Sequence, residues 1–208
     1  MRLLMVDTET TGLPLWSEPS DHPDQPHLVQ LALLMVNAET REDVHTESLI
    51  VRPDGWIIPK TASDIHGITT EIATCRGLPL LLVVAVFTNL RALADTTAAH
   101  NASFDRKVID VACARLGKQP AKGWPETSIC TKDLAAPLVN LPPTPKMLAR
   151  HMMRPKPPTL TEAYAYFFGT TFEAAHGANA DSRAAARILF HILKGGGKYE
   201  HPMMGREG

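Results

Sequence analysis

The chain has 208 residues, of which 44% are hydrophobic and 21% charged, a composition typical of one globular domain with a substantial core. Its formal net charge of -1 excludes a general electrostatic attraction to nucleic acid, so contact with a polyanion requires a local basic patch or metal ions. Its 3 cysteines are widely spaced, which argues against a disulfide framework or a zinc cluster and favours a reducing compartment.

The sequence carries no pattern typical of export or membrane insertion. The apolar start MRLLMV is too short for a signal peptide. The most apolar run, Leu78–Phe87, has about half the length needed to span a bilayer. We therefore expect a soluble, cytoplasmic protein.

Strand patterns dominate the first quarter of the chain. Leu3–Glu9 predicts a buried strand that ends in two acids, and a polar, proline-bearing loop follows at Pro14–His27. Leu28–Val36 and Val44–Arg52 predict two strands joined by a polar turn, as in a β-hairpin. Shorter strand candidates lie at Thr96–His100 and Ser128–Thr131.

Apolar residues at helical spacing predict three helices in the rest of the chain. The first covers residues 104–116, with Ser103 as its expected N-cap. The second covers residues 160–168 and is closed by Gly169, and the third extends to Lys194. Leu78–Leu93 is ambiguous, because its valines favour a strand and its length favours a helix.

This order of elements predicts an α/β domain. Strands that first form a hairpin-linked set and then alternate with helices indicate a mixed sheet covered by helices. We expect a single domain over residues 1–195, with a proline-rich insertion at about 137–158. Residues 196–208 are expected to form a mobile C-terminal tail.

Two acids at the end of the first predicted strand indicate a site. Asp7 and Glu9 are two residues apart, so in a strand both carboxylates project from one face and repel each other unless a cation lies between them. Such pairs also arise by chance. A buried strand that runs directly into two acids, however, is costly unless the acids have a function.

Three more residues carry chemistry only in combination. Asp105 and Asp181 each lie near the start of a predicted helix, where an acid ordinarily stabilises the helix dipole. A lone histidine such as His176 usually has no special role. Since His176 and Asp181 would point apart on one helix, a shared site requires His176 in the preceding loop, with Gly177 supplying flexibility.

Together, these residues and their neighbours resemble the DEDDh branch of the DEDD 3′–5′ exonuclease superfamily, which includes the epsilon-type proofreading subunits of bacterial DNA polymerase. The resemblance rests on Asp7–Leu13 (DTETTGL), His100–Asp105 (HNASFD) and His176–Ala185 (HGANADSRAA), in the family's order and with family-like spacing. Weaker matches are Ser63–Thr69 (SDIHGIT) and Ile129–Ala135 (ICTKDLA).

The resemblance implies a ribonuclease H-like fold, in which a five-stranded mixed sheet is flanked by helices and residues 1–195 form a single exonuclease domain. The three N-terminal strands would be antiparallel and the two short strands parallel to the first. It also implies that Leu78–Leu93 is a helix.

The resemblance further implies a two-metal hydrolytic centre. Asp7, Glu9, Asp105 and Asp181 would hold two Mg²⁺ or Mn²⁺ ions, which prefer oxygen ligands and lie about 4 Å apart in such centres. His176 would be the general base, because an unperturbed imidazole accepts a proton near neutral pH. The product would be a nucleoside 5′-monophosphate released from a 3′ end.

Residues around this centre would bind the terminal nucleotide. Leu13 would pack against the base, and Asn101 would assist near the phosphates. Phe104 is expected in the core rather than under a base, because it heads an apolar helical stripe. The full set expected to bind substrate is Thr8, Thr10, Thr11, Gly12, Leu13, His66 and Asn101.

The basic side chains of the proline-rich insertion have two interpretations. They could follow the phosphates of the incoming strand, or they could belong to a solvated linker that is basic without a role. The residues concerned are Lys146, Arg150, Arg154 and Lys156.

The leading prediction is a metal-dependent 3′–5′ exonuclease on single-stranded or frayed DNA ends, standing alone or serving a DNA polymerase. An exoribonuclease on RNA ends is the alternative, because the catalytic residues do not distinguish the sugar. A non-catalytic nucleic-acid-binding module is disfavoured, since no expected metal ligand is missing. A ribonuclease H-type endonuclease is disfavoured by Thr10–Leu13, and the tyrosine-using branch by Gly177, which stands where its tyrosine would align.

Overall fold

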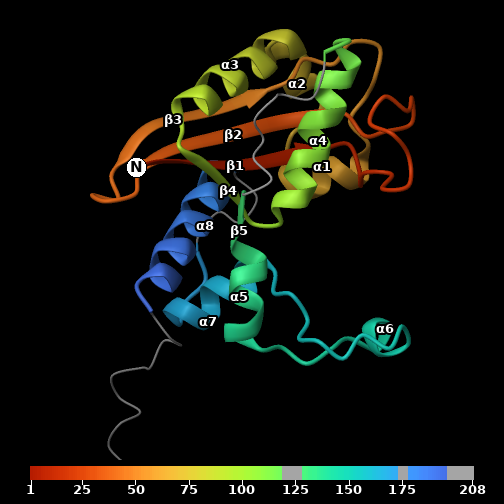
Figure 1. Cartoon of the computed structure of the whole chain (residues 1–208). Coiled ribbons are helices and arrows are strands. Elements are labelled where there is room, and N and C mark those ends of the chain that lie inside the picture. The colour runs from red at the N-terminus through yellow and green to blue at the C-terminus, as the bar shows by residue number, and fades with distance from the viewer. Residues whose placement is uncertain (119–127, 173–177, 196–208) are drawn as a thin grey trace, which may run out of the picture.

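The computed structural model describes residues 1–118, 128–172 and 178–195. A five-stranded sheet forms its centre (Figure 1). The strands are β1 (Arg2–Thr10), β2 (Leu28–Asn37), β3 (Asp43–Ile50), β4 (Thr96–Ala99) and β5 (Ile129–Cys130). The helices are α1 (Lys60–His66), α2 (Thr70–Arg76), α3 (Leu80–Leu93), α4 (Ala102–Arg115), α5 (Thr131–Val139), α6 (Pro145–Leu148), α7 (Leu160–Phe168) and α8 (Ala178–Leu193).

Strand β1 lies in the middle of the sheet, whose order is β3-β2-β1-β4-β5. It pairs antiparallel with β2 and parallel with β4, while β3 and β5 form the two edges. The predicted mixed sheet, with three antiparallel N-terminal strands and two short parallel ones, is therefore confirmed.

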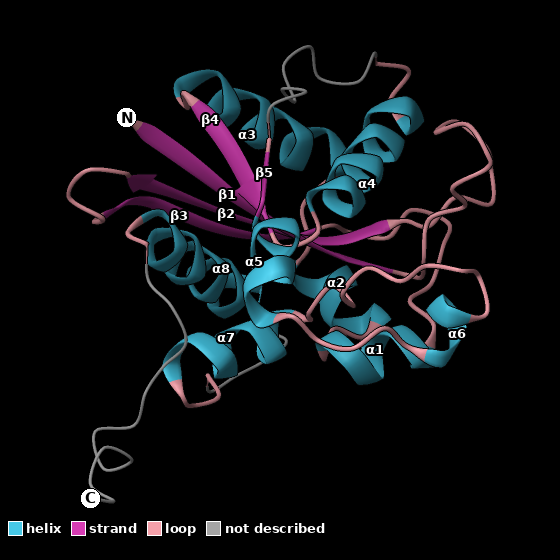
Figure 2. Cartoon of the chain, turned by 60° about the horizontal axis from the view of Figure 1, so that its bottom comes forward, coloured by secondary structure: helices cyan, strands magenta, loops and turns pink. Residues whose placement is uncertain are grey.

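The alternation of side chains along β1 divides the core between the two faces of the sheet. Leu4 and Val6 pack with α3 and α4 on one face, and Leu3 and Met5 pack with α8 on the other. Figure 2 shows these helices on opposite sides of the strands. A residue of β1 therefore meets either α4 or α8, according to its parity.

The ambiguous segment Leu78–Leu93 contains helix α3, which begins directly after Pro79. Its valines face the sheet: Val83 and Val84 are buried in the core, so tertiary packing overrides their strand preference. The three predicted helices are present as α4, α7 and α8. Helix α7 ends at Gly169, which has a left-handed conformation with φ 67°.

The prediction that Ser103 caps α4 is wrong. The helix begins at Ala102, and the residue before it is Asn101, which has a left-handed φ of 88°. Asparagine tolerates this conformation better than most residues, so the chain turns sharply out of β4 and starts the helix earlier than the apolar stripe indicates. Ser103 is exposed within the first turn.

The proline-rich insertion is only partly helical. It overlaps the end of α5 and contains the single turn α6, and a bridge between Leu141 and Lys156 ties its two ends together. The ammonium of Lys156 lies 2.6 Å from the Glu162 carboxylate, so this cation is engaged within the protein. The other three basic side chains of the insertion, Lys146, Arg150 and Arg154, are exposed.

The predicted tail at 196–208 lies outside the described residues. Within the described part of the chain, none of the helices combines the length and the apolar character that crossing a bilayer demands.

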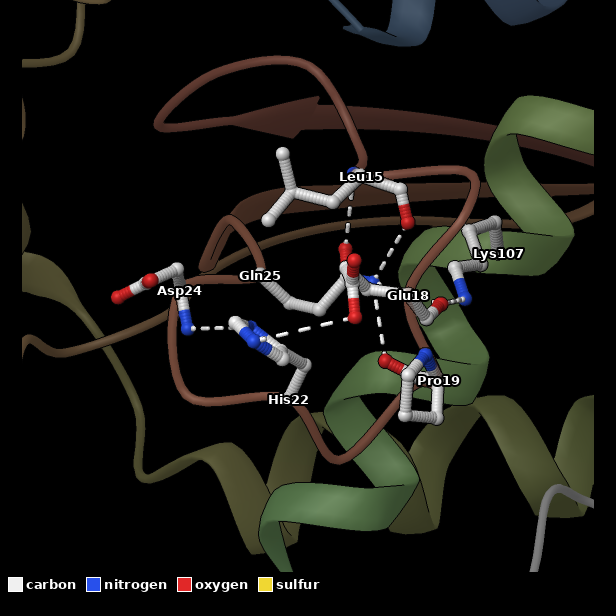
Figure 3. A network of polar contacts seen from close by, with 7 residues as sticks. All are labelled: Leu15, Glu18, Pro19, His22, Asp24, Gln25 and Lys107. Carbon is white, nitrogen blue, oxygen red and sulfur yellow. Dashed lines mark hydrogen bonds and ion pairs between the residues drawn. The ribbon is translucent and has the colours of Figure 1, made fainter.

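A buried glutamine holds the loop that follows β1 (Figure 3). Gln25 is 2% exposed. Its Nε2 donates to the carbonyls of Leu15 (2.9 Å), Glu18 (3.2 Å) and Pro19 (3.0 Å), and its Oε1 accepts from the N–H of Leu15 (3.1 Å). The Lys107 ammonium of α4 donates to the same Glu18 carbonyl at 2.9 Å, which fastens the loop to the helix.

We expect Gln25→Leu to lower the free energy of unfolding by about 2–3 kcal/mol, because it keeps the side-chain volume but leaves several loop groups without a partner. Urea unfolding measures the change. Gln30→Leu is the matched control: it removes one exposed bond, from Nε2 to the Ser48 hydroxyl at 3.0 Å, and should cost less than about 1 kcal/mol. Equal losses in the two variants would contradict a special role for Gln25.

Candidate metal centre and substrate cavity

Three carboxylates from two elements meet beside the middle of the sheet. Asp7 and Glu9 share one face of β1, and Asp181 approaches them from the first turn of α8. One oxygen from each carboxylate lies within 4.8 Å of the others. The structure thus brings Asp181, from near the C-terminal end of the sequence, beside the N-terminal pair Asp7 and Glu9.

The fourth predicted acid, Asp105, lies next to this group but outside the set of mutually close oxygens. It is 3% exposed, near the start of α4. The Thr8 hydroxyl, on the α4 side of β1, donates to Asp105 Oδ1 at 2.8 Å. The charge of Asp105 contributes to the raised pKa of Asp7, so the carboxylates of Asp105 and Asp7 are close enough to repel each other. One segment of β1 therefore supplies two acids and positions a third.

Burial and mutual repulsion raise the pKa values of the cluster. Burial, followed by the charges of Asp105, Glu9 and Asp181, raises the pKa of Asp7 well above its ordinary range. Burial and then Asp181 raise the pKa of Glu9 to about 7. Burial raises the pKa of Asp105 to about 7 although the Thr8 hydrogen bond opposes the shift. Ionising all four groups near neutral pH is therefore costly unless positive charge enters the cluster.

The donor set fits a divalent cation. Asp7 Oδ2 is buried and has no hydrogen-bond partner among the described residues. A buried carboxylate oxygen without a partner is unfavourable, and hard cations such as Mg²⁺ and Mn²⁺ prefer oxygen ligands. Asp7, Glu9 and Asp181 could hold such an ion, with Asp105 beside them.

A cavity of about 320 Å³ borders the cluster at Glu9. Leu13 is 81% exposed and Ile65 is 60% exposed, so two large apolar side chains at this cavity face water. Every residue predicted to bind substrate lines the cavity except Asn101. The other lining residues are Glu9, Thr61, Ala62, Ile65 and Phe104, and of these the sequence did not single out Thr61, Ala62 and Ile65.

Phe104 has two roles that the sequence presents as alternatives. It packs against the core formed with α3 and α4, as its helical stripe predicts. It also lines the cavity. The signals that could have indicated this wall were positional, because Phe104 immediately precedes Asp105 and Ile65 immediately precedes His66.

The His66 ring is held in one protonation state at the cavity wall. The ring is 7% exposed, and burial lowers its pKa, so it is neutral near pH 7. Nδ1 accepts the N–H of Ile68 at 3.1 Å, which leaves the proton on Nε2. That N–H is buried, and a hydrogen bond with the Thr10 backbone opposes the lowering of the His66 pKa.

Asn101 and His100 directly precede α4, and both have partners within the protein. Asn101 Oδ1 accepts from the Lys132 ammonium. His100 Nδ1 lies 2.9 Å from the Thr131 hydroxyl, and its Nε2 lies 3.2 Å from the Pro158 carbonyl. His176, the predicted base, lies outside the described residues.

Comparison with known families identifies the chain. A protein-family model described as "Exonuclease" (RNase_T) matches residues 4–189, most of the sequence. The chain belongs to this exonuclease family. This membership agrees with the exonuclease family that the sequence motifs predict, and the carboxylate cluster fits a divalent metal ion. No curated protein matches the sequence.

Solved exonuclease structures share the fold at low sequence identity. The nuclease domain of 3′hExo, a DEDDh family member, bound to rAMP has 15% identity and a TM-score of 0.69, with 96% of this exonuclease and 94% of that chain covered. A second structure, which concerns 3′-end-specific recognition of the histone mRNA stem-loop by a 3′-exonuclease, has 17% identity and a TM-score of 0.67. The match covers 95% of this exonuclease and 83% of that chain.

E. coli exonuclease I in complex with a dT13 oligonucleotide has 20% identity to this exonuclease and a TM-score of 0.70. The match covers 92% of this chain but only 40% of exonuclease I. This exonuclease therefore spans about two-fifths of the exonuclease I chain.

We expect Glu9→Gln to stabilise the metal-free protein at pH 8 and not at pH 4.5. The pKa of Glu9 is raised on folding, so its contribution is present at low pH and is lost as the pH rises through about 7. The gain at pH 8 should be on the order of 2 kcal/mol. Urea unfolding in a chelator, compared with wild type at each pH, measures it.

Glu9→Gln must be compared with wild type at each pH because two histidines also make stability depend on pH. Burial lowers the pKa values of His27 and His100 to about 4, so their contribution to stability is lost as the pH falls, in wild type and variant alike. Glu42→Gln, on an exposed acid, should change stability little at either pH. A Glu9→Gln effect that is the same at pH 4.5 and pH 8 would contradict the raised pKa.

Proposed function

We propose that this exonuclease removes nucleotides from the 3′ ends of single-stranded or frayed DNA, using two Mg²⁺ or Mn²⁺ ions held by Asp7, Glu9, Asp105 and Asp181. The observation that carries the proposal is the carboxylate cluster, with its unpartnered Asp7 oxygen, directly beside a cavity with exposed apolar side chains. The crystallised complex of exonuclease I with dT13 supports a single-stranded DNA substrate.

An RNA end is the second candidate substrate. The match includes 94% of the 3′hExo chain in the structure with rAMP and 83% of the histone mRNA 3′-exonuclease chain, compared with 40% of the exonuclease I chain. Contacts to a ribose 2′-hydroxyl would distinguish the two substrates, and such contacts depend on side chains at the terminal sugar.

In the proposed reaction, the side chains of this exonuclease bind the last nucleotide and move one proton. Leu13, Ile65 and Phe104 pack against the terminal base, and His66 contacts the nucleotide from the cavity wall. Thr8 keeps Asp105 beside the other acids. Bound cations would supply Lewis-acid activation of water and neutralise charge on the scissile phosphate.

His176 would take the proton from the attacking water, because an unperturbed imidazole can accept a proton near neutral pH. The water oxygen bonds to phosphorus and the bond from phosphorus to the 3′-oxygen breaks. That oxygen gains a proton on the shortened strand, and the terminal nucleotide leaves as a 5′-monophosphate.

The cellular setting that we propose is a cytoplasmic one, standing alone or beside a DNA polymerase, as the resemblance to epsilon-type subunits implies. No disulfide joins Cys75, Cys113 and Cys130, all of which are described, and this fits a reducing compartment. A proofreading role would require faster removal of mispaired than of paired primer ends.

We expect 5′-labelled substrates to give a ladder of 3′-shortened products only when Mg²⁺ or Mn²⁺ is present. Single-stranded DNA, RNA of the same sequence, and duplexes with paired or mispaired 3′ ends are compared by gel electrophoresis. Asp181→Asn should lower kcat by a factor of about 10³ or more, since it removes one ligand charge. Activity retained in Asp181→Asn, or cuts within a circular strand, would contradict the proposal.

For His176 we expect His176→Ala to lower kcat by a factor of about 10²–10⁴ and to change the Kd for a DNA oligonucleotide little. Binding is measured in Ca²⁺, with His151→Ala, an exposed histidine of the insertion, as the control. Equal losses in rate and in binding would refute the assignment of His176 as the base.

A further inference from the structure

A second and larger cavity lies away from the substrate cavity. Its volume is about 720 Å³, and none of its described lining residues belongs to the substrate cavity. It is enclosed by the start of β2, the chain after β3, the start of α3 and the end of α4. The charged and aromatic residues of its lining are His27, Arg52, Asp54, Trp56 and Arg115.

Two guanidinium groups line this cavity without a carboxylate partner among the described residues. Arg52 Nε donates to the Gly77 carbonyl at 3.0 Å, and Arg115 Nη2 donates to the Gln25 carbonyl at 2.5 Å. Arg115 Nε is buried and has no partner within the described part of the chain. Asp54 is the one acid among the described lining residues, whose positive charges therefore exceed their negative charge.

An aromatic wall stands beside these cations. The rings of His27 and Trp56 are stacked, with centroids 4.5 Å apart and planes at 10°. Burial and the charge of Arg115 lower the pKa of His27 to about 4, so this ring stays neutral near pH 7. Apolar side chains complete the lining, namely Leu80, Leu81 and Leu116.

We propose that this cavity is a second binding site for a nucleotide, with the phosphate at Arg52 and Arg115 and the base against the His27–Trp56 wall. Guanidinium groups bind phosphate oxygens through paired N–H donors, and planar bases pack on aromatic rings without sequence preference. The cavity has the volume of a typical small-molecule site. The nucleotide can be a free monophosphate or one unit of a strand.

The second site shares a loop with the substrate cavity. The His27 N–H donates to the Thr11 hydroxyl at 2.9 Å, and the Thr11 N–H donates to the His27 carbonyl at 3.0 Å. Thr11 also lines the substrate cavity. A nucleotide bound at His27 and Arg115 would therefore contact a residue that is hydrogen-bonded to Thr11 in the lining of the substrate cavity.

The test uses the full chain carrying Asp7→Asn and Glu9→Gln, in a chelator, so that binding does not depend on metal or on turnover. Calorimetric titration with dAMP should show binding that Arg52→Gln weakens about tenfold or more, because a charged hydrogen-bonding partner is lost. Arg76→Gln, which alters an exposed arginine of α2 outside the cavity, should leave the affinity unchanged. Thermal unfolding checks that both variants are folded.

Deoxyadenosine and inorganic phosphate, each tested alone, should bind more weakly than dAMP. Phosphate that binds as tightly as dAMP, dAMP binding that Arg52→Gln leaves intact, or no dAMP binding at millimolar concentration would each overturn the proposal. A five-residue oligo(dA) tested beside dAMP identifies the source: tighter binding of the oligonucleotide assigns the site to the strand, and equal binding assigns it to the free nucleotide.

Discussion

The repulsion among buried carboxylates at the centre of the sheet is the constraint on which the site depends. Asp7 and Glu9 lie within the central strand β1, so they cannot be moved into water without breaking the pairing of β1 with β2. Asp181 is fixed by the packing of α8 on the same face. The fold therefore holds negative charges together at a free-energy cost, and that cost becomes binding energy when a divalent cation enters.

The rest of the site is arranged around this charge. Thr8 faces the opposite side of β1 and binds Asp105, so the alternation of a single strand organises acids on two faces of the sheet. The chain then turns through the lining of the substrate cavity into the loop fixed by Gln25 and Lys107. Two of the acids and five other cavity residues thus occupy one short stretch of sequence, Asp7–Leu13, between a strand and a hydrogen-bonded loop.

The elements with a clear apolar period were predicted from the sequence, and the family was predicted from several motifs taken together. β1, α7 and the hairpin of β2 and β3 follow from period and turn residues alone, and the exonuclease family followed from three separated motifs. The start of α4 was missed because the left-handed conformation of Asn101 is a local choice that periodicity does not record. The position of Ile65 beside His66 could have indicated it, but the second cavity was missed because contacts between distant segments leave no local pattern.

If the carboxylate cluster binds divalent cations, calorimetric titration of the metal-free protein with Mn²⁺ should detect the binding. Buffers of different ionisation enthalpy report the protons released. Because the pKa values of Glu9 and Asp105 are about 7, binding at pH 7 should release protons, and the release should decline by pH 8.5. Absence of Mn²⁺ binding, or binding and proton release that Asp7→Asn leaves unchanged, would contradict the account.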